Sequence, residues 1–245
     1  MESISKTNKN FIRKIINLSG KAINQHHMIE ANDRILVAVS GGKDSLALLD
    51  ILYERRKFLP INYEIHAIHI ITDDVPYEID RKFLHDFCHN RNIHLHLLTT
   101  HAGIQEKQDK KPCFTCSWNR RKELFDFARK NNFKKIAFGH HLDDAIETLV
   151  MNMVMHANIS SIPPTLTMFE GKIEVIRPLI LNTNKEMQEY AKIKKFKSLK
   201  KECPFEDHTL RNSAREWINQ LETITPQARI NLYKSMGHID HDYLP

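Results

Sequence analysis

The chain has 245 residues, 41% of them hydrophobic and 27% charged, which is enough apolar material for a generous core and argues against a disordered protein. It has no apolar run of about 18 residues and its first residues lack a signal-peptide core, so we expect a cytoplasmic protein with no membrane partner, in which cysteines are reduced, metal-bound or catalytic. The net charge of +6 is equally compatible with a polyanionic partner such as RNA and with solvated helix faces, and no RNA-binding signature with interleaved aromatic residues is visible.

Strands and helices are predicted to alternate along most of the chain. Apolar residues at helical spacing predict an amphipathic helix within a helical segment of residues 1–30. The expected strands are 35–39, 63–70, 93–100, 134–139 and 172–179, and the expected helices between them are 45–57, 78–90, 121–131 and 143–157. This alternation predicts an α/β fold over 31–181: a Rossmann-like parallel sheet of about five strands with helices on both faces. A C-terminal helical segment, 182–245, follows and carries the third cysteine of interest.

The sequence SGGKDS, residues 40–45, joins the first predicted strand to its helix. Gly41 and Gly42 permit a tight turn that lets backbone N–H groups approach a phosphate, and the helix directs its positive end at the same ligand. Lys43 adds a point charge, and Asp44 can orient the loop or hold Mg²⁺. The spacing differs from the Walker pattern, yet its strand–loop–helix context predicts a phosphate site. The expected ATP-binding residues here are Ser40, Gly41, Gly42, Lys43, Asp44 and Ser45.

A second polar element, GHHLDDAIET (139–148), follows the fourth predicted strand. Asp143 and Asp144 stand at the carboxyl end of that strand, where they can reach the same phosphates. Their simpler interpretation is an acidic pair that stabilises a helix N-terminus. His140 is a candidate contact to nucleotide or substrate. This element adds Gly139, His140, Asp143 and Asp144 to the expected ATP-binding residues.

Both elements resemble those of a known superfamily. SGGKDS after an apolar strand resembles the PP-loop of the N-type ATP pyrophosphatases, and GHHLDDAIET is similar to their GHxxDDxxET element. The resemblance implies cleavage of ATP between its α- and β-phosphates and an adenylated intermediate. Such activation makes chemical sense because a nucleobase carbonyl oxygen is a poor leaving group, whereas AMP is a good one. Lys43, Asp44 and Asp144, with Mg²⁺, are the expected catalytic groups around the phosphates.

Two of the four cysteines form the motif Cys113-x-x-Cys116. With the preceding proline and the following Arg120, this motif resembles the PCxxC element of the tRNA 2-thiocytidine synthetase family. That family also has a later cysteine beyond an RPL strand end, a place that Cys203 occupies here, although without a second cysteine three residues later. The resemblance implies that Cys113, Cys116 and Cys203 hold a [4Fe–4S] cluster with one open iron, and that Arg120 is catalytic.

The residues themselves leave other thiol sites open. Three thiolates and a histidine can hold structural zinc, with His101, His140 or His208 as the fourth ligand. A disulfide or a thioredoxin-like dithiol fits the expected compartment and the position of the motif less well. Cys88 lies among apolar residues of a predicted helix and is expected to be a core residue.

The resemblance predicts an ATP-dependent tRNA sulfurtransferase that 2-thiolates a pyrimidine, with cytidine favoured over uridine because the chain lacks the uridine enzymes' extra cysteine modules. The expected partners are tRNA and a sulfur donor, either a cysteine desulfurase or sulfide, and a homodimer is an open possibility. The alternatives are a lysidine-synthetase-like or other PP-loop ligase, thiolation of a small molecule, and a non-catalytic ATP- and zinc-binding RNA module.

Overall fold

The structure, a computed structural model, describes residues 5–75, 80–103, 112–197 and 210–243. The strands are β1 (Arg34–Ala38), β2 (Glu64–Thr72), β3 (His94–Thr100), β4 (Lys135–Ala137), β5 (Thr165–Met168) and β6 (Ile173–Ile176). The helices are α1 (Lys6–Gln25), α2 (Lys43–Arg56), α3 (Arg81–His89), α4 (Pro112–Lys130), α5 (Leu142–His156), α6 (Asn184–Ile193), α7 (Leu210–Ile224) and α8 (Ala228–Ser235), with a short 3₁₀ turn at His241–Tyr243.

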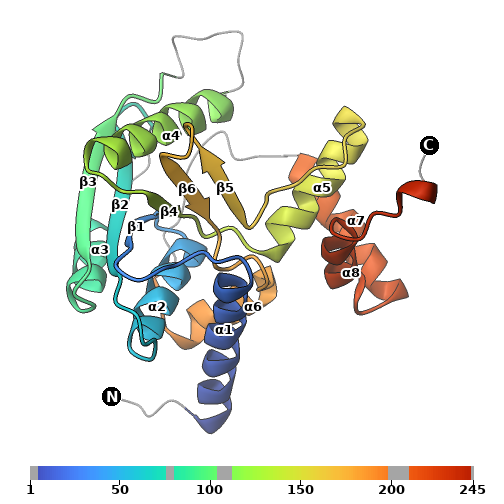
Figure 1. Cartoon of the computed structure of the whole chain (residues 1–245), viewed down its shortest axis with the longest axis horizontal. Coiled ribbons are helices and arrows are strands. Elements are labelled where there is room, and N and C mark those ends of the chain that lie inside the picture. Colours follow the sequence, from blue (N-terminus) through green and yellow to red (C-terminus); the bar gives the residue numbers. More distant parts are fainter. Residues whose placement is uncertain (1–4, 76–79, 104–111, 198–209, 244–245) are drawn as a thin grey trace.

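All six described strands form one sheet, in the order β3-β2-β1-β4-β6-β5 (Figure 1). Every pairing is parallel except that between β5 and β6. The predicted α/β class and parallel sheet are therefore confirmed, with six strands instead of about five. The sequence analysis did not identify β5 because its alternation, TLTM, is only four residues long and none of these residues is fully buried at this edge of the sheet.

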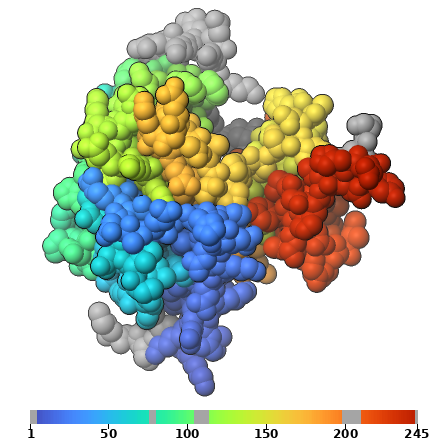
Figure 2. Space-filling view, viewed as in Figure 1, coloured from blue at the N-terminus to red at the C-terminus, as the bar shows by residue number. Residues whose placement is uncertain are grey.

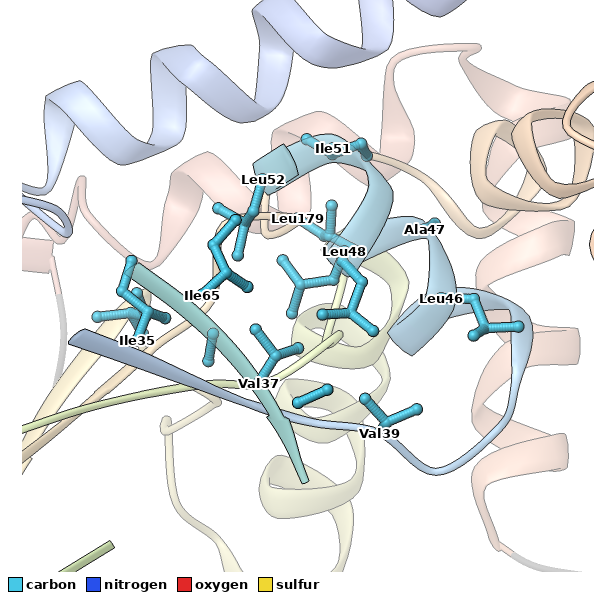
Figure 3. Close-up of a cluster of buried hydrophobic side chains, with 14 of the residues drawn as sticks. Ile35, Val37, Val39, Leu46, Ala47, Leu48, Ile51, Leu52, Ile65 and Leu179 are labelled. Carbon is cyan, nitrogen blue, oxygen red and sulfur yellow. The ribbon is translucent and has the colours of Figure 1, made fainter. Parts of the chain in front are cut away.

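The sheet is covered on both faces, and β1 shows how its sequence achieves this. Ile35, Val37 and Val39 pack into the larger core with α1, α2, α3 and α6, whereas Leu36 points to the opposite core, beneath α4. Figure 3 shows the larger core, with β1 side chains packed against apolar residues of α2. A strand that is buried on both faces has a continuous run of apolar residues in its sequence. The run ILVAV, residues 35–39, therefore predicted this strand.

The order of the strands reverses beside β1, since β2 lies on one side of it and β4 on the other. The phosphate-loop residues 40–45 follow β1, and the segment 139–141 follows β4. The carboxyl ends of two adjacent parallel strands thus bring the two predicted polar elements together. This is the place where open α/β sheets bind their ligands.

Helix α4 begins earlier than its sequence predicts. It starts at Pro112 instead of residue 121, so the cysteine motif belongs to its first turns and not to a loop. Proline is favoured at a first helical position because its missing N–H has no partner to lose there. The only large apolar residues in these first turns, Phe114 and Trp118, are exposed and stand among polar residues, which is why the start was missed.

The C-terminal helices divide between two cores. The side chains of Met187 and Tyr190 place α6 in the main core, whereas α7 and α8 pack against α5 around Ile146 and Ile218. Figure 2 shows α7 and α8 as a distinct group beside α5. The packing thus separates α6 from α7 and α8 within the predicted segment 182–245. Among the residues described, no helix has the length and apolarity needed to cross a membrane.

Candidate active site

A cavity of about 330 Å³ lies at the carboxyl ends of β1 and β4. Three parts of the chain line it: the phosphate loop with the start of α2, the segment after β4, and the first turns of α4. The polar lining residues are Ser40, Asp44, Ser45, Ser117, Arg120, Arg121, His140 and Asp144. Seven of the residues predicted as catalytic or ATP-binding therefore line a single cavity: Ser40, Asp44, Ser45, Arg120, Gly139, His140 and Asp144.

The phosphate loop is held in shape by its own hydrogen bonds. The Gly42 N–H donates to Ser40 Oγ at 3.2 Å, and Ser45 Oγ donates to the Gly42 carbonyl at 2.9 Å. Gly41 has a φ of 83°, in the left-handed region that favours glycine. The loop leads directly into α2, whose N-terminal N–H groups and positive dipole end favour an anion beside the cavity.

Gly139 is the point at which the two polar elements touch. A Cβ atom placed on Gly139 would lie 3.0 Å from both the carbonyl carbon and the carbonyl oxygen of Asp44. A residue with a side chain at this position would force the two backbones apart by a few tenths of an ångström. The glycine of the GHHLDD element therefore fixes the distance between that element and the phosphate loop.

Lys43 and Asp44 form a pair at the start of α2. The Lys43 ammonium lies 2.8 Å from each carboxylate oxygen of Asp44. Asp44 lines the cavity and Lys43 does not. His141 stands between Asp44 and Asp144, with ring nitrogens 3.9 Å from the former carboxylate and 3.4 Å from the latter.

His140 is oriented by an arginine that the sequence interpretation passed over. Arg177 Nε lies 3.2 Å from His140 Nδ1, and since a guanidinium only donates, Nδ1 is the acceptor. Burial lowers the pKa of His140 to about 4 despite the opposing charge of Asp144, so the ring is neutral near pH 7. Its single proton therefore resides on Nε2, and the ring, stacked on Phe138, offers a hydrogen-bond donor.

Arg177 is itself held firmly behind the ring. Its side chain donates from Nη1 to the Pro163 carbonyl at 2.6 Å, and burial lowers its pKa to about 10, which leaves it charged near neutral pH. The signal that points to it is its position, one residue after the last core strand, at the carboxyl edge where the other site residues gather.

The acidic residues of α5 face arginines of the two C-terminal helices. Asp144 accepts from Arg211 at 2.7 Å and from the His141 N–H at 3.0 Å. Asp143 pairs with Arg229 and also accepts from the Asn184 N–H at 2.6 Å. One turn further along, Glu147 accepts from Arg215 at 2.8 Å.

Asp143 and Asp144 therefore have different surroundings. Asp144 lines the cavity, and although burial alone would raise its pKa, His141, the His141 N–H and Arg211 hold the pKa below its usual value. Asp143 is buried outside the lining and anchors α8 through Arg229. In this structure Asp143 forms an ion pair with Arg229, and its contact with ATP stays a prediction.

The cysteine motif lies beside the cavity on α4. Cys116 is half-buried and immediately precedes Ser117, a lining residue. The Cys113 side chain and all of Cys203 lie outside the described residues. Cys88 is buried in the main core, as predicted, and burial raises the pKa of its thiol to about 11, which makes it a poor ligand.

Comparisons with known proteins agree with this geometry. A family profile described as the PP-loop domain matches residues 7–222. The tRNA-cytidine(32) 2-sulfurtransferase 1 of Francisella tularensis subsp. tularensis is 33% identical over 238 residues, which cover 95% of this chain and 88% of that protein. The tRNA-cytidine(32) 2-sulfurtransferase of Shewanella woodyi is 35% identical over 233 residues, covering 93% and 72%. The structure of the U34-tRNA thiolase NcsA from Methanococcus maripaludis with its [4Fe-4S] cluster shares the fold, with a TM-score of 0.76 and 21% identity over 95% of this chain and 81% of that one.

Proposed function

Because the chain belongs to the PP-loop family and, within it, to the group of the tRNA-cytidine(32) 2-sulfurtransferases, we propose that it is an ATP-dependent tRNA sulfurtransferase that 2-thiolates cytidine. The observation that carries the proposal is the single cavity where the phosphate loop, His140, Asp144 and Arg120 meet beside Cys116. No feature of an ordinary nucleotide-binding sheet requires a cysteine motif at that place.

Adenylation is the first step. The carbonyl oxygen at position 2 of the cytidine attacks the α-phosphorus of ATP, and the bond from phosphorus to the bridging β-oxygen breaks, so pyrophosphate leaves with the electron pair. The loop N–H groups and the N-terminus of α2 hold the β- and γ-phosphates. Asp44 and Asp144 supply the carboxylate oxygens that Mg²⁺ prefers, and Mg²⁺ offsets negative charge when bound. Arg120 and the His140 Nε2–H are donors for the reacting phosphate or the base.

Sulfur transfer completes the reaction. A sulfide supplied by the donor attacks carbon 2 of the adenylated base, AMP leaves with the original oxygen, and loss of a proton gives the 2-thio base. Cys113, Cys116 and Cys203 would hold a [4Fe–4S] cluster, which when bound supplies an iron that lacks a protein thiolate and can carry sulfide. Adenylation needs hydrogen-bond donors to the phosphates, and sulfur transfer needs a thiolate site nearby. The two steps together explain why both kinds of group lie at one cavity.

The donor set fits a cluster better than zinc. Zinc in a closed site needs a fourth ligand besides three thiolates. His140 is unsuited because its Nδ1 accepts from Arg177 and its Nε2 carries the proton. The ring nitrogens of His101 lie 3.0 Å from Asp73 and 3.5 Å from Asp74, so a metal bound by His101 would be shared with those two carboxylates and not only with the thiolates. His208 lies outside the described residues.

A cysteine series tests this proposal. Anaerobically purified wild type should contain about four irons per chain, and Cys113→Ala, Cys116→Ala and Cys203→Ala should lose most of the iron together with tRNA thiolation. Cys88→Ala is the matched control and should keep both. If the three variants thiolated tRNA like wild type, or if wild type contained stoichiometric zinc instead of iron, the cluster assignment would be wrong. Full ATP turnover with an amine acceptor and no thiolation would favour the PP-loop ligase alternative.

A further inference from the structure

Helix α4 exposes two aromatic rings next to the residues that line the cavity. Phe114 and Trp118 are four residues apart, and their rings stack with centroids 6.4 Å apart and planes 16° apart. The two residues are 54% and 59% exposed. Large aromatic side chains dominate the energetics of cores and interfaces, so a stacked pair that is more than half exposed is a candidate binding surface.

The pair continues into a stripe along the helix. Arg121 lies three residues beyond Trp118, and Phe125 lies four residues beyond Arg121, so helical periodicity places all four side chains on neighbouring positions. Phe125 packs edge-on against Phe169 of the β5–β6 turn, with ring centroids 5.3 Å apart. Arg121 also lines the cavity. The stripe is therefore continuous with the candidate active site.

This stripe corrects the impression that basic and aromatic residues do not interleave in this chain. Aromatic residues separated by three other residues look scattered in the sequence, and a helix starting at 121 would have left Phe114 and Trp118 in a loop. Because α4 starts at Pro112, the same residues form one face. The arrangement was invisible until the start of that helix was known.

The charge of this part of the helix selects the kind of partner. Residues 112–122 contain Arg120, Arg121 and Lys122 and no acidic residue. An apolar protein partner gains nothing from such a cluster, whereas a nucleic acid needs cations for its phosphates and flat surfaces for unpaired bases. The surroundings of the other tryptophan differ, since Trp217 on α7 follows Glu216 and lines an apolar groove with Val150 and Leu210.

We propose that Phe114, Trp118 and Arg121 form a stacking surface for unpaired nucleotides that neighbour the target base of the tRNA. Single-stranded RNA is recognised by stacking of splayed bases on aromatic rings and guanidinium planes, with phosphates held by arginine and lysine. The target base enters the cavity while its neighbours stack on the outer face of α4. This inference rests on the proposed function, because it takes the RNA substrate from there and adds the surface that holds it.

Trp118 provides a direct probe. The chain has two tryptophans, so a Trp217→Phe background leaves Trp118 as the only tryptophan. Titration with an RNA hairpin whose unpaired loop contains cytidine should quench the emission of Trp118, because a base stacked on the indole quenches it. A fully paired duplex made from the same stem should leave the emission nearly unchanged. The full-length protein is used throughout.

Substitutions separate stacking from other roles of the rings. Loss of one base–aromatic stack corresponds to about a 5- to 150-fold weaker Kd for the hairpin, and this is expected for Trp118→Ala and Trp118→Leu. Trp118→Phe and Trp118→Tyr should restore most of the affinity, because they keep a π face. Trp217→Ala is the matched control and should bind the hairpin like wild type. Iron content should be the same in all of these variants.

The outcomes distinguish this inference from the proposed function. Wild type that binds the hairpin, together with Trp118→Ala and Phe114→Ala variants that bind it equally well, would overturn the stacking surface and leave the sulfurtransferase proposal standing. Trp118→Leu with full affinity, or Trp118→Ala that loses iron but keeps its RNA affinity, would also overturn it, in favour of a ring that only packs around the cysteines. Wild type with no affinity for the hairpin or for whole tRNA would overturn both.

Discussion

Replacing Gly139 by alanine tests how the two polar elements make one site. The added Cβ would lie 3.0 Å from the carbonyl carbon and oxygen of Asp44 and 3.1 Å from the Ser45 nitrogen, where ordinary contact begins at 3.4 Å. These atoms belong to backbone, so no side chain can rotate away, and the start of α2 or the segment after β4 must shift by a few tenths of an ångström. Overpacking of this kind costs about 1–3 kcal/mol of stability.

ATP binding should weaken as well as stability. The shifted backbone carries the N–H groups at the start of α2, and a hydrogen bond to a charged group contributes about 1.5–3 kcal/mol, which corresponds to about a 10- to 150-fold weaker Kd. Isothermal titration with a non-hydrolysable ATP analogue measures the affinity, and thermal unfolding of the same sample measures the stability.

Gly237→Ala is the matched control for this experiment. Its Cβ would meet only the Lys234 carbonyl oxygen at 3.7 Å, an ordinary contact, so affinity and stability should both stay near wild type. If Gly139→Ala bound the analogue with wild-type affinity, the contact between the two elements would not shape the nucleotide site. If it lost stability alone, the glycine would serve the fold and not the ligand.

Two further substitutions test the buried charges. Arg177→Met removes the donor to His140 Nδ1. In ¹⁵N-histidine spectra the His140 signals should show the Nε2–H tautomer alone in wild type and a mixture of tautomers in the variant. Unchanged His140 signals would contradict the assignment. Asp50 is buried among Arg91, Lys194 and Tyr190. The substitution Asp50→Asn should lower the free energy of unfolding, measured in urea, by about 3–5 kcal/mol. Burial alone would raise the pKa of Asp50, but Lys194 and its other partners lower it below 3.8, so its stabilisation is complete above about pH 5 and is lost as pH falls through the lowered folded-state pKa. In Asp50→Asn the free energy of unfolding should therefore fall less steeply as the pH is lowered. An equally steep fall in the variant would assign the acid dependence to other carboxylates.

The sequence was informative wherever the signal is local. SGGKDS and GHHLDDAIET each lie within one strand–loop–helix unit, so their residue types and order were enough to predict that Ser40, Asp44, His140 and Asp144 would share one site, and all four line the same cavity. Because β1 and β4 are adjacent parallel strands, their carboxyl ends then bring the two units together. The same local reasoning identified Cys88 as a core residue from the apolar positions around it on α3.

The remaining site residues depend on packing between distant segments. Asp143 and Arg229 are 86 residues apart, and Asp144 and Arg211 are 67 apart, so no local pattern links them. Only after α7 and α8 dock on α5 does an acidic face of one helix meet arginines of two others. The start of α4 was missed for a different reason: a proline and two cysteines are weak helix signals, although proline is well suited to the first position.

The most direct test of the central claim follows both products of one reaction. Anaerobically reconstituted protein with Mg²⁺, ATP labelled in its α-phosphate, sulfide and unmodified tRNA should yield labelled AMP, pyrophosphate and one 2-thiocytidine per AMP formed in coupled turnover, quantified by chromatography of the nucleotides and mass spectrometry of the digested tRNA. ADP as the labelled product, or AMP without any thionucleoside when the cluster is intact, would contradict the account.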